Sequence, residues 1–127
     1  MNTMKTGEGS RRRAPRLAIR LEGRLVGRVA RPITLLDLSF TGCLVQCEAL
    51  LDSGAILDLD LELDGEPFLA KVRVVDSSLD GARLPQGSPG FLAGLDFLSL
   101  PAREETRLRR FLEEERRRRQ SAEAPSH

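Results

Sequence analysis

The sequence predicts an all-β domain with one C-terminal helix, in the form of a six-stranded antiparallel β-barrel. Short segments of alternating apolar and polar residues recur along the chain, and turn residues separate them. The last apolar segment differs, because Leu108, Phe111 and Leu112 have helical spacing. A chain of 127 residues is long enough for one domain with a substantial core.

The first half of the chain contains three predicted strands joined by two turns. Residues 19–25 alternate apolar and polar side chains, which is the period of a half-buried strand. We expect a turn at residues 27–32 and a returning strand at residues 33–36. A second turn is predicted at residues 39–42, and the third strand occupies residues 42–47.

The clearest strand pattern lies at residues 57–63, where leucines alternate with acidic residues. One face of this strand is expected to be buried and the other to be acidic. Asp64 and Gly65 then give a strong signal for a two-residue hairpin turn. In the next strand, residues 68–74, the apolar side chains point inward, so its two cations are expected to face the acids across the hairpin.

Turn-forming residues dominate residues 76–90, and we expect a long flexible connection there. Residues 91–97 give the sixth strand pattern. A helix is expected to follow, because Pro101 suits a first turn and Glu104 and Glu105 favour the positive N-terminal end of a helix.

We divide the chain into three parts. Residues 1–9 carry glycines without apolar periodicity and are expected to be disordered, residues 10–116 form the barrel with its helix, and residues 117–127 form a frayed charged tail. No apolar run reaches the length of a membrane span, and the N-terminus lacks the apolar core of a signal peptide. We therefore expect a cytoplasmic protein.

The sequence argues against an enzyme. The single histidine is His127, the last residue, so Ser39 and the two cysteines have no plausible histidine base. Cys43 and Cys47 are too few for a disulfide framework or a metal site, and we expect plain buried thiols. Neither a catalytic residue nor a metal or cofactor is predicted.

The N-terminal arginine segment is the first candidate for ligand binding. Arg11, Arg12, Arg13 and Arg16 lie within six residues, and Pro15 disfavours a helix there. Arginine binds phosphate oxygens and the O6/N7 edge of guanine, although a solvated basic tail is the simpler interpretation. Because the net charge of the chain is only +1, a small anionic ligand is favoured over non-specific nucleic-acid binding.

The second candidate is the sequence Asp-x-Ser-x-x-Gly, formed by Asp37, Ser39 and Gly42. It is a turn pattern first, since Asp and Ser side chains bond nearby backbone amides and Gly permits positive φ. With a chain reversal at residues 27–32, Asp37 is expected opposite residues 20–22. The arginine segment then passes the same end of the barrel, where it could share one small volume with the Asp/Ser pair.

At these residues the sequence resembles the PilZ domain, a six-stranded barrel family that binds cyclic di-GMP (c-di-GMP). The family motif Arg-x-x-x-Arg matches Arg12 and Arg16, with the additional Arg11 before it, and the Asp-x-Ser-x-x-Gly motif is the second family motif. The final strand of the family often reads Gly-apolar-x-Phe before a C-terminal helix, as residues 94–97 do. The resemblance covers residues 10–115.

The resemblance implies a c-di-GMP receptor and gives each motif residue a role. Arg12 and Arg16 would serve phosphate oxygens or a guanine. Asp37 would accept from the N1–H and N2–H₂ donors of guanine, which adenine does not present. Ser39 would bond a base edge or a phosphate, and Gly42 would let the backbone come close.

An arginine directly before the first motif goes with binding of a stacked ligand dimer in this family, so Arg11 implies two ligands per chain. We add Arg13 and Gly94 as secondary ligand-binding candidates. Ligand is expected to order residues 10–16 across the barrel end, creating a surface that an unidentified protein partner could recognise. An oligomer is possible, and the pathway, whether motility, exopolysaccharide or development, stays open.

Two other functions remain as alternatives. One is a PilZ-like adaptor that binds protein without nucleotide, and loss of either motif would favour it. The other is a basic nucleic-acid-binding module, which would show a steep salt dependence of binding. That second class also lacks support from aromatic residues, because the chain has no Trp or Tyr and only five Phe.

Overall fold

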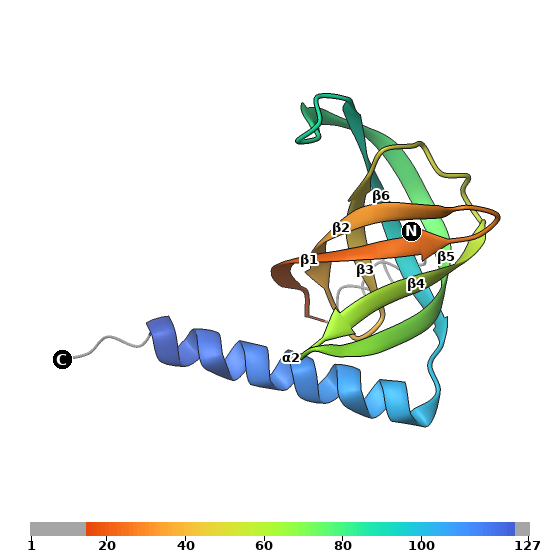
Figure 1. The fold of residues 1–127 in the computed structure, drawn as a ribbon. Coiled ribbons are helices and arrows are strands. Elements are labelled where there is room, and N and C mark those ends of the chain that lie inside the picture. Colours follow the sequence, from red (N-terminus) through yellow and green to blue (C-terminus); the bar gives the residue numbers. More distant parts are fainter. Residues whose placement is uncertain (1–14, 124–127) are drawn as a thin grey trace, which may run out of the picture.

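The computed structural model describes residues 15–123, and these form a closed barrel of six antiparallel strands with one long helix beside it (Figure 1). The strands neighbour one another in the order β1-β2-β3-β6-β5-β4, which confirms the predicted fold class. The predicted disordered tail, residues 1–9, and the arginines at positions 11–13 lie outside the described residues. The elements are β1 (Leu17–Val26), β2 (Ala30–Leu38), β3 (Gly42–Cys47), β4 (Ile56–Leu63), β5 (Glu66–Arg83), β6 (Pro89–Ser99) and α2 (Ala102–Glu123).

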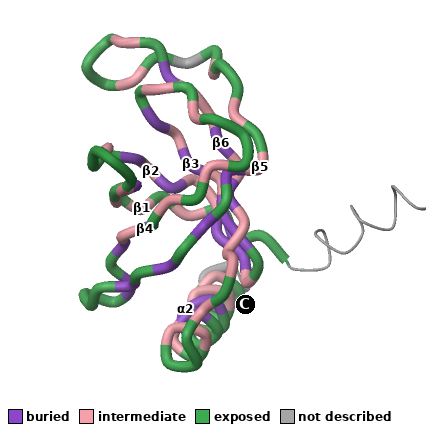
Figure 2. Tube along the Cα trace, turned by 90° about the vertical axis from the view of Figure 1, so that its right-hand side faces the viewer, coloured by how far each residue is buried: buried purple, intermediate pink, exposed green. Residues whose placement is uncertain are grey.

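The core is built from alternate residues of the strands, as the sequence pattern predicts. Figure 2 shows buried positions recurring between more exposed ones along the barrel wall. Phe68 is fully buried and meets the ring of Phe97 edge to face, with ring centroids 6.2 Å apart. The predicted apolar stripe of α2 belongs to the same core. The buried residues of β4, β5 and α2 are Leu59, Leu61, Leu63, Phe68, Ala70, Val72, Val74, Leu108, Phe111 and Leu112.

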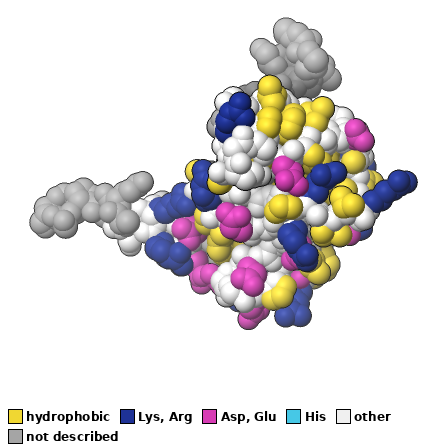
Figure 3. Space-filling model, turned by 45° about the horizontal axis from the view of Figure 1, so that its top comes forward, with side chains coloured by type: hydrophobic (Ala, Val, Ile, Leu, Met, Phe, Trp, Pro, Cys, Tyr) yellow, Lys and Arg dark blue, Asp and Glu magenta, His cyan; other side chains and the backbone are white. Residues whose placement is uncertain are grey.

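The β4–β5 hairpin turns at Asp64 and Gly65, as predicted. Both residues have positive φ, 54° and 79°, which is the geometry that matches the twist of the flanking strands. The expected charge pairing across this hairpin forms at one position, where Lys71 Nζ donates to Asp58 Oδ1 at 3.0 Å. Asp60 instead pairs with an arginine of β1. Figure 3 shows acidic and basic side chains interspersed over one face of the molecule.

The prediction of a long flexible connection at residues 76–90 is wrong. Strand β5 continues to Arg83, β6 begins at Pro89, and the two pair along an extended hairpin that stands above the barrel in Figure 1. Only residues 84–88 turn, with Gly87 at a φ of 93°. Residues 76–83 are mostly polar and lack the alternation of a half-buried strand, so the sequence pattern did not predict a strand there. Backbone pairing with β6, and not a continuous buried face, stabilises this part of β5.

The predicted position of Asp37 opposite residues 20–22 is also wrong, since the structure pairs Asp37 with Ala18. The chain reverses earlier than expected, so that Val26 already pairs with Ala30. An irregularity in β1 just after Ala18 shifts the register further. Asp37, near the end of β2, therefore lies opposite the beginning of β1, where the arginine segment joins the barrel.

Helix α2 begins directly after Pro101, whose carbonyl oxygen accepts a hydrogen bond from the N–H of Glu105 at 2.9 Å. It continues to Glu123, so residues 117–123 are helical, in contrast to the expected frayed tail. Ion pairs between Glu115 and the arginines three and four residues later explain the difference, because they stabilise an exposed helix end. Within the described part of the chain, no helix is long and apolar enough to cross a membrane.

The position of α2 relative to the barrel is held by Arg107. Its guanidinium donates hydrogen bonds to the carbonyl oxygens of Leu63, Glu66 and Pro67 in the β4–β5 hairpin. The same group pairs with Glu104 on the helix at 2.9 Å. Arg107 thus fastens the helix to the end of β4 and the beginning of β5.

The barrel closes through a short seam between β1 and β4. The two strands pair only over residues 24–26 and 58–60. Across this seam Arg24 Nη2 donates to Asp60 Oδ2 at 2.8 Å. The close approach of β4 also requires Gly23, where a Cβ would lie 2.7 Å from the carbonyl oxygen of Asp60.

Candidate functional site

The turn between β2 and β3 is organised by the buried hydroxyl of Ser39, a residue that is 4 % exposed. Its Oγ accepts hydrogen bonds from the N–H groups of Thr41 and Gly42, both at 3.1 Å. The N–H of Ser39 in turn donates to the carbonyl oxygen of Gly42 at 2.8 Å. The hydroxyl is therefore used within the turn, and it fixes the shape of the backbone that connects the two strands.

Gly42 serves this turn for a different reason from the one predicted. It is not among the described glycines with positive φ, so the expected conformational role is wrong. Instead, Gly42 pairs with Asp96 of β6, and a Cβ on Gly42 would overlap the carbonyl oxygen of Leu95. The missing side chain allows β3 and β6 to approach closely at the base of the turn.

Asp37 and Arg16 meet beside this turn. Arg16 Nη1 donates to Asp37 Oδ2 at 3.4 Å, which is a long and weak contact. The Arg16 side chain is 53 % exposed and the Asp37 side chain 17 %. The other carboxylate oxygen, Oδ1, is buried and has no hydrogen-bond partner among the described residues. A carboxylate accepts about four hydrogen bonds, so Asp37 retains unused acceptor capacity.

A small cavity of about 20 Å³ lies between the turn and β6. It is far smaller than the ~300–1,000 Å³ of pockets that enclose a small-molecule ligand, so a nucleotide at this site would lie over the cavity. Gly94, a predicted secondary residue, lies in its wall, and a Cβ there would be 3.2 Å from Asp76 Oδ1. The lining residues are Arg16, Ser39, Thr41, Gly42, Cys43, Val75, Gly94, Leu95 and Asp96.

Cys43 is the one thiol that reaches this cavity, and its surroundings make it unreactive. Burial raises the pKa of the Cys43 thiol, and the negative charge of Asp37 raises that pKa further, whereas Arg16 lowers it. Burial also raises the pKa of the Cys47 thiol. Both cysteines are buried free thiols, as the sequence predicts, and both stay protonated at neutral pH.

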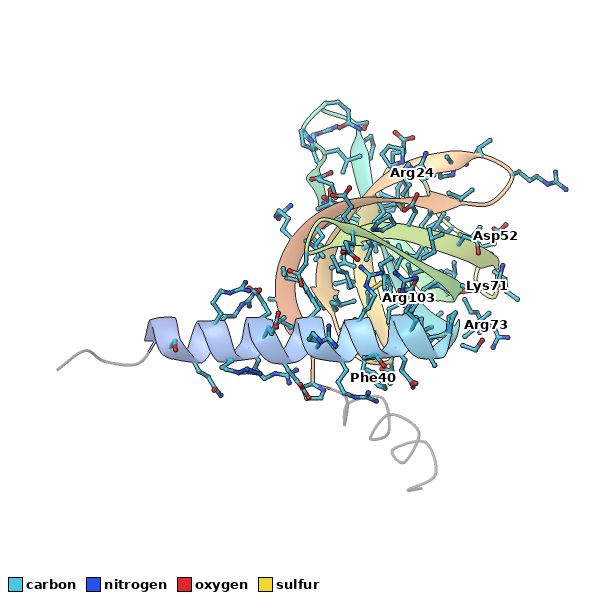
Figure 4. All side chains as sticks on the ribbon, turned by 60° about the horizontal axis from the view of Figure 1, so that its bottom comes forward. Arg24, Phe40, Asp52, Lys71, Arg73 and Arg103 are labelled. Atoms are coloured by element: carbon cyan, nitrogen blue, oxygen red, sulfur yellow. The ribbon has the colours of Figure 1, made fainter. Side chains whose placement is uncertain are left out.

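Some site features are missing from the sequence prediction. Thr41 and Asp96 line the cavity, and the carbonyl oxygen of Thr41 accepts a hydrogen bond from the N–H of Phe97. Thr41 and Asp96 could have been found only from the pairing of β3 with β6, which the periodicity of the sequence does not reveal. The guanidinium carbon of Arg109 also lies 5.0 Å from the ring centroid of Phe40. Figure 4 shows Phe40 beside helix α2.

The structure brings Arg16, Asp37, Ser39 and Gly42 together at one end of the barrel, with Gly94 in the wall of the same cavity. The predicted ligand-binding residues Arg11, Arg12 and Arg13 lie outside the described residues. The structure does fix where their segment joins the barrel, because Leu17 at the beginning of β1 pairs with Leu38, next to Asp37. Within residues 15–123, no cluster of three His, Cys, Asp or Glu side chains is placed to hold a metal ion. The site offers a guanidinium donor next to a carboxylate acceptor.

Several solved protein structures share this fold. The PilZ domain with c-di-GMP of YcgR from Escherichia coli is 18 % identical, with a TM-score of 0.70, and the match covers 91 % of this chain and 99 % of that one. MrkH, described as a c-di-GMP-dependent transcription regulatory factor, is 16 % identical with a TM-score of 0.66, and the match covers 80 % and 49 % of the two chains. The Bacillus subtilis inhibitor of motility, MotI/DgrA, is 15 % identical with a TM-score of 0.63, and the match covers 82 % and 51 %.

At these identities the structures establish a common fold. This chain spans about half the length of the second and third proteins. No curated protein sequence is significantly similar to it. The sequence model of one family, described as the PilZ domain, does match residues 10–114, which include both arginine and Asp/Ser motifs and all six strands. The chain belongs to the PilZ domain family.

Proposed function

We propose that this protein is a c-di-GMP receptor whose ligand lies over the β2–β3 turn. The observation that carries the proposal is the loose contact between Arg16 and a largely buried Asp37 that keeps acceptor capacity. Membership of the PilZ family and the likeness to a PilZ domain solved with c-di-GMP support the same ligand.

The ligand chemistry suits these groups. The Asp37 carboxylate accepts hydrogen bonds from N1–H and N2–H₂ of guanine, a pair of donors that adenine lacks. Arg16, which is exposed and held by one long contact, is free to turn toward a phosphate or a guanine O6/N7 edge. Arg12 would supply a second guanidinium from the preceding segment. Because the Ser39 hydroxyl is engaged within the turn, its contribution is to hold the backbone under the ligand.

Signal transmission would use the arginine segment. Residues 10–16 carry four arginines and no apolar stripe that would dock them on the barrel, and mutual repulsion opposes their ordering without an anion. Binding of c-di-GMP would draw this segment across the barrel end and create a new surface. A protein partner would recognise that surface, and the receptor would thereby relay the second-messenger signal.

The direct test is a calorimetric titration of the full chain with c-di-GMP, alongside the variants Arg16→Ala and Arg12→Ala. Each substitution is expected to weaken binding by about 1.5–3 kcal/mol, the scale of a hydrogen bond to a charged group. Arg24→Ala is the matched control, because Arg24, like Arg16, is an exposed arginine paired with an aspartate. Cyclic di-AMP should not compete.

Two results would contradict the proposal. Equal losses in the Arg16→Ala and Arg24→Ala variants would put the ligand elsewhere. Absence of c-di-GMP binding by the unmutated chain would favour the adaptor that acts through protein contacts alone.

We also propose that two c-di-GMP molecules bind per chain, with Arg11 engaging the second. The Arg11→Leu variant should then lower the stoichiometry from two toward one while the first binding step persists. A one-to-one isotherm for the unmutated protein at saturating ligand would refute this stoichiometry.

A further inference from the structure

A second hollow, of about 150 Å³, lies between the β2–β3 turn and helix α2. This hollow adjoins the candidate site, because two of its lining residues are sequence neighbours of site residues: Pro15 precedes Arg16, and Phe40 follows Ser39. It is also much larger than the cavity of about 20 Å³ under that site. The lining residues are Pro15, Phe40, Arg109, Leu112, Glu113 and Arg116.

The walls of this hollow combine a flat apolar surface with charged groups. Phe40, Leu112 and Pro15 supply the apolar part, and the guanidinium of Arg109 lies over the Phe40 ring at 5.0 Å. A guanidinium over an aromatic ring can also offer a planar surface on which a base stacks. Among the charged lining residues, Arg109 and Glu113 are exposed and Arg116 is half-buried, so a ligand can reach their polar groups.

The charged groups of the hollow are not engaged with one another. Within residues 15–123, neither Glu113 nor Arg116 forms an ion pair or a side-chain hydrogen bond. Another hollow lies between α2 and the β4–β5 hairpin. Its Arg107 is already engaged, because the guanidinium donates to three backbone carbonyl oxygens and to Glu104. Arg109 and Arg116 therefore remain available as donors, and Glu113 remains available as an acceptor.

We propose that this hollow is a guanine subsite for the second c-di-GMP molecule, an inference that rests on the proposed function. Arg109 stacks on the guanine, and the Glu113 carboxylate accepts from its N1–H and N2–H₂ groups, as Asp37 does for the first ligand. Arg116 binds a phosphate oxygen of the same molecule. The second ligand thereby contacts the turn and α2 at once, so helix residues become part of the ligand site.

The test is the stoichiometry of c-di-GMP binding to the full chain, measured by calorimetry and equilibrium dialysis. Glu113→Gln and Arg109→Ala should each weaken the second binding step at least tenfold and leave the first step unchanged. Glu114→Gln and Arg117→Ala are matched controls, because these exposed neighbours on the same helix do not line the hollow. An unchanged melting temperature of each variant would show that the fold is intact.

The outcomes separate this inference from the function on which it rests. Two-step binding that Glu113→Gln and Arg109→Ala leave untouched would overturn the α2 subsite alone. One-to-one binding by the unmutated chain would overturn both the subsite and the stoichiometry of two, and would leave the receptor function standing. Equal losses in the Glu114→Gln control would also overturn it. No binding to the unmutated chain would overturn the receptor function as well.

Discussion

Two arginine–aspartate pairs, one within β1 and one just before it, link this part of the chain to a neighbouring strand. The pairs differ in how completely their groups are used. Arg24 donates to Asp60 at 2.8 Å across the β1–β4 seam, whereas Arg16 donates to Asp37 at 3.4 Å beside the β2–β3 turn. The Arg24 and Arg16 side chains are similarly exposed, at 58 % and 53 %. The exposure of the arginines therefore does not distinguish the two pairs.

The carboxylates explain the difference. Asp60 is more exposed than Asp37, 29 % against 17 %, so water can satisfy its remaining acceptor positions. Asp37 has one oxygen in a long contact and the other buried without a partner among residues 15–123. An unpartnered buried oxygen is unfavourable for folding, so Asp37 has a vacant acceptor position that a water, an ion or a ligand group could fill. The first pair belongs to the barrel, and we assign the second to the ligand site.

The largest expected effect is on affinity. Asp37→Ala should weaken c-di-GMP binding by about 1–3 kcal/mol, the scale of one lost bidentate contact to a base edge. Asp60→Ala should leave the affinity unchanged, although it removes the shorter of the two ion pairs. Parallel calorimetric titrations measure both, and equal effects of the two substitutions would remove the distinction between the pairs.

The next effect concerns the chain segments that carry the two pairs. On c-di-GMP binding, backbone amide protection should rise in residues 10–16, the segment that ends at the Asp37 partner Arg16, and change little in the strand that carries Asp60. Hydrogen exchange with and without ligand gives this comparison directly. If residues 10–16 are already protected in the free protein, ligand-driven ordering of the arginine segment is ruled out even where binding is tight.

The smallest effect is on the stability of the free protein. Asp60→Ala should lower the free energy of unfolding by about 0.2–1 kcal/mol, because exposed ion pairs contribute little. Asp37→Ala should leave this free energy unchanged or raise it slightly, because the substitution removes a buried oxygen without a partner. Urea denaturation measures the difference, and a larger loss for Asp37→Ala than for Asp60→Ala would mean that Asp37 has a structural role.

The parts of the fold that periodicity governs could be predicted from sequence. The leucines of β4, the turn at Asp64 and Gly65, and the stripe at Leu108, Phe111 and Leu112 each follow from one local pattern, and all three agree with the structure. Residues 76–83 could not be predicted in this way, because long-range pairing with β6 determines that strand.

For the candidate site, the sequence motifs pointed to residues that the structure brings together, but not to the geometry that does so. The motifs named Arg16, Asp37, Ser39 and Gly42, but the register of Asp37 depended on a tighter β1–β2 turn and a strand irregularity that leave no sequence signal. The role of Gly42 depends on the close approach of β6. The contact of Phe40 with Arg109 depends on how α2 packs against the barrel. Each of these is a contact between segments far apart in the chain, which local patterns do not encode.

The short β1–β4 seam has a consequence for folding. Residues 24–26 and 58–60 are separated by two intervening strands, so closing the cylinder costs loop entropy, and three residues on each strand are few to compensate for it. We therefore expect the seam to form late on the folding pathway and to open first in native-state fluctuations, as a local rather than a global event. The backbone amides of Leu25 and Leu59 would then exchange through this opening, while those deep in the β5–β6 ladder would wait for the whole barrel to unfold.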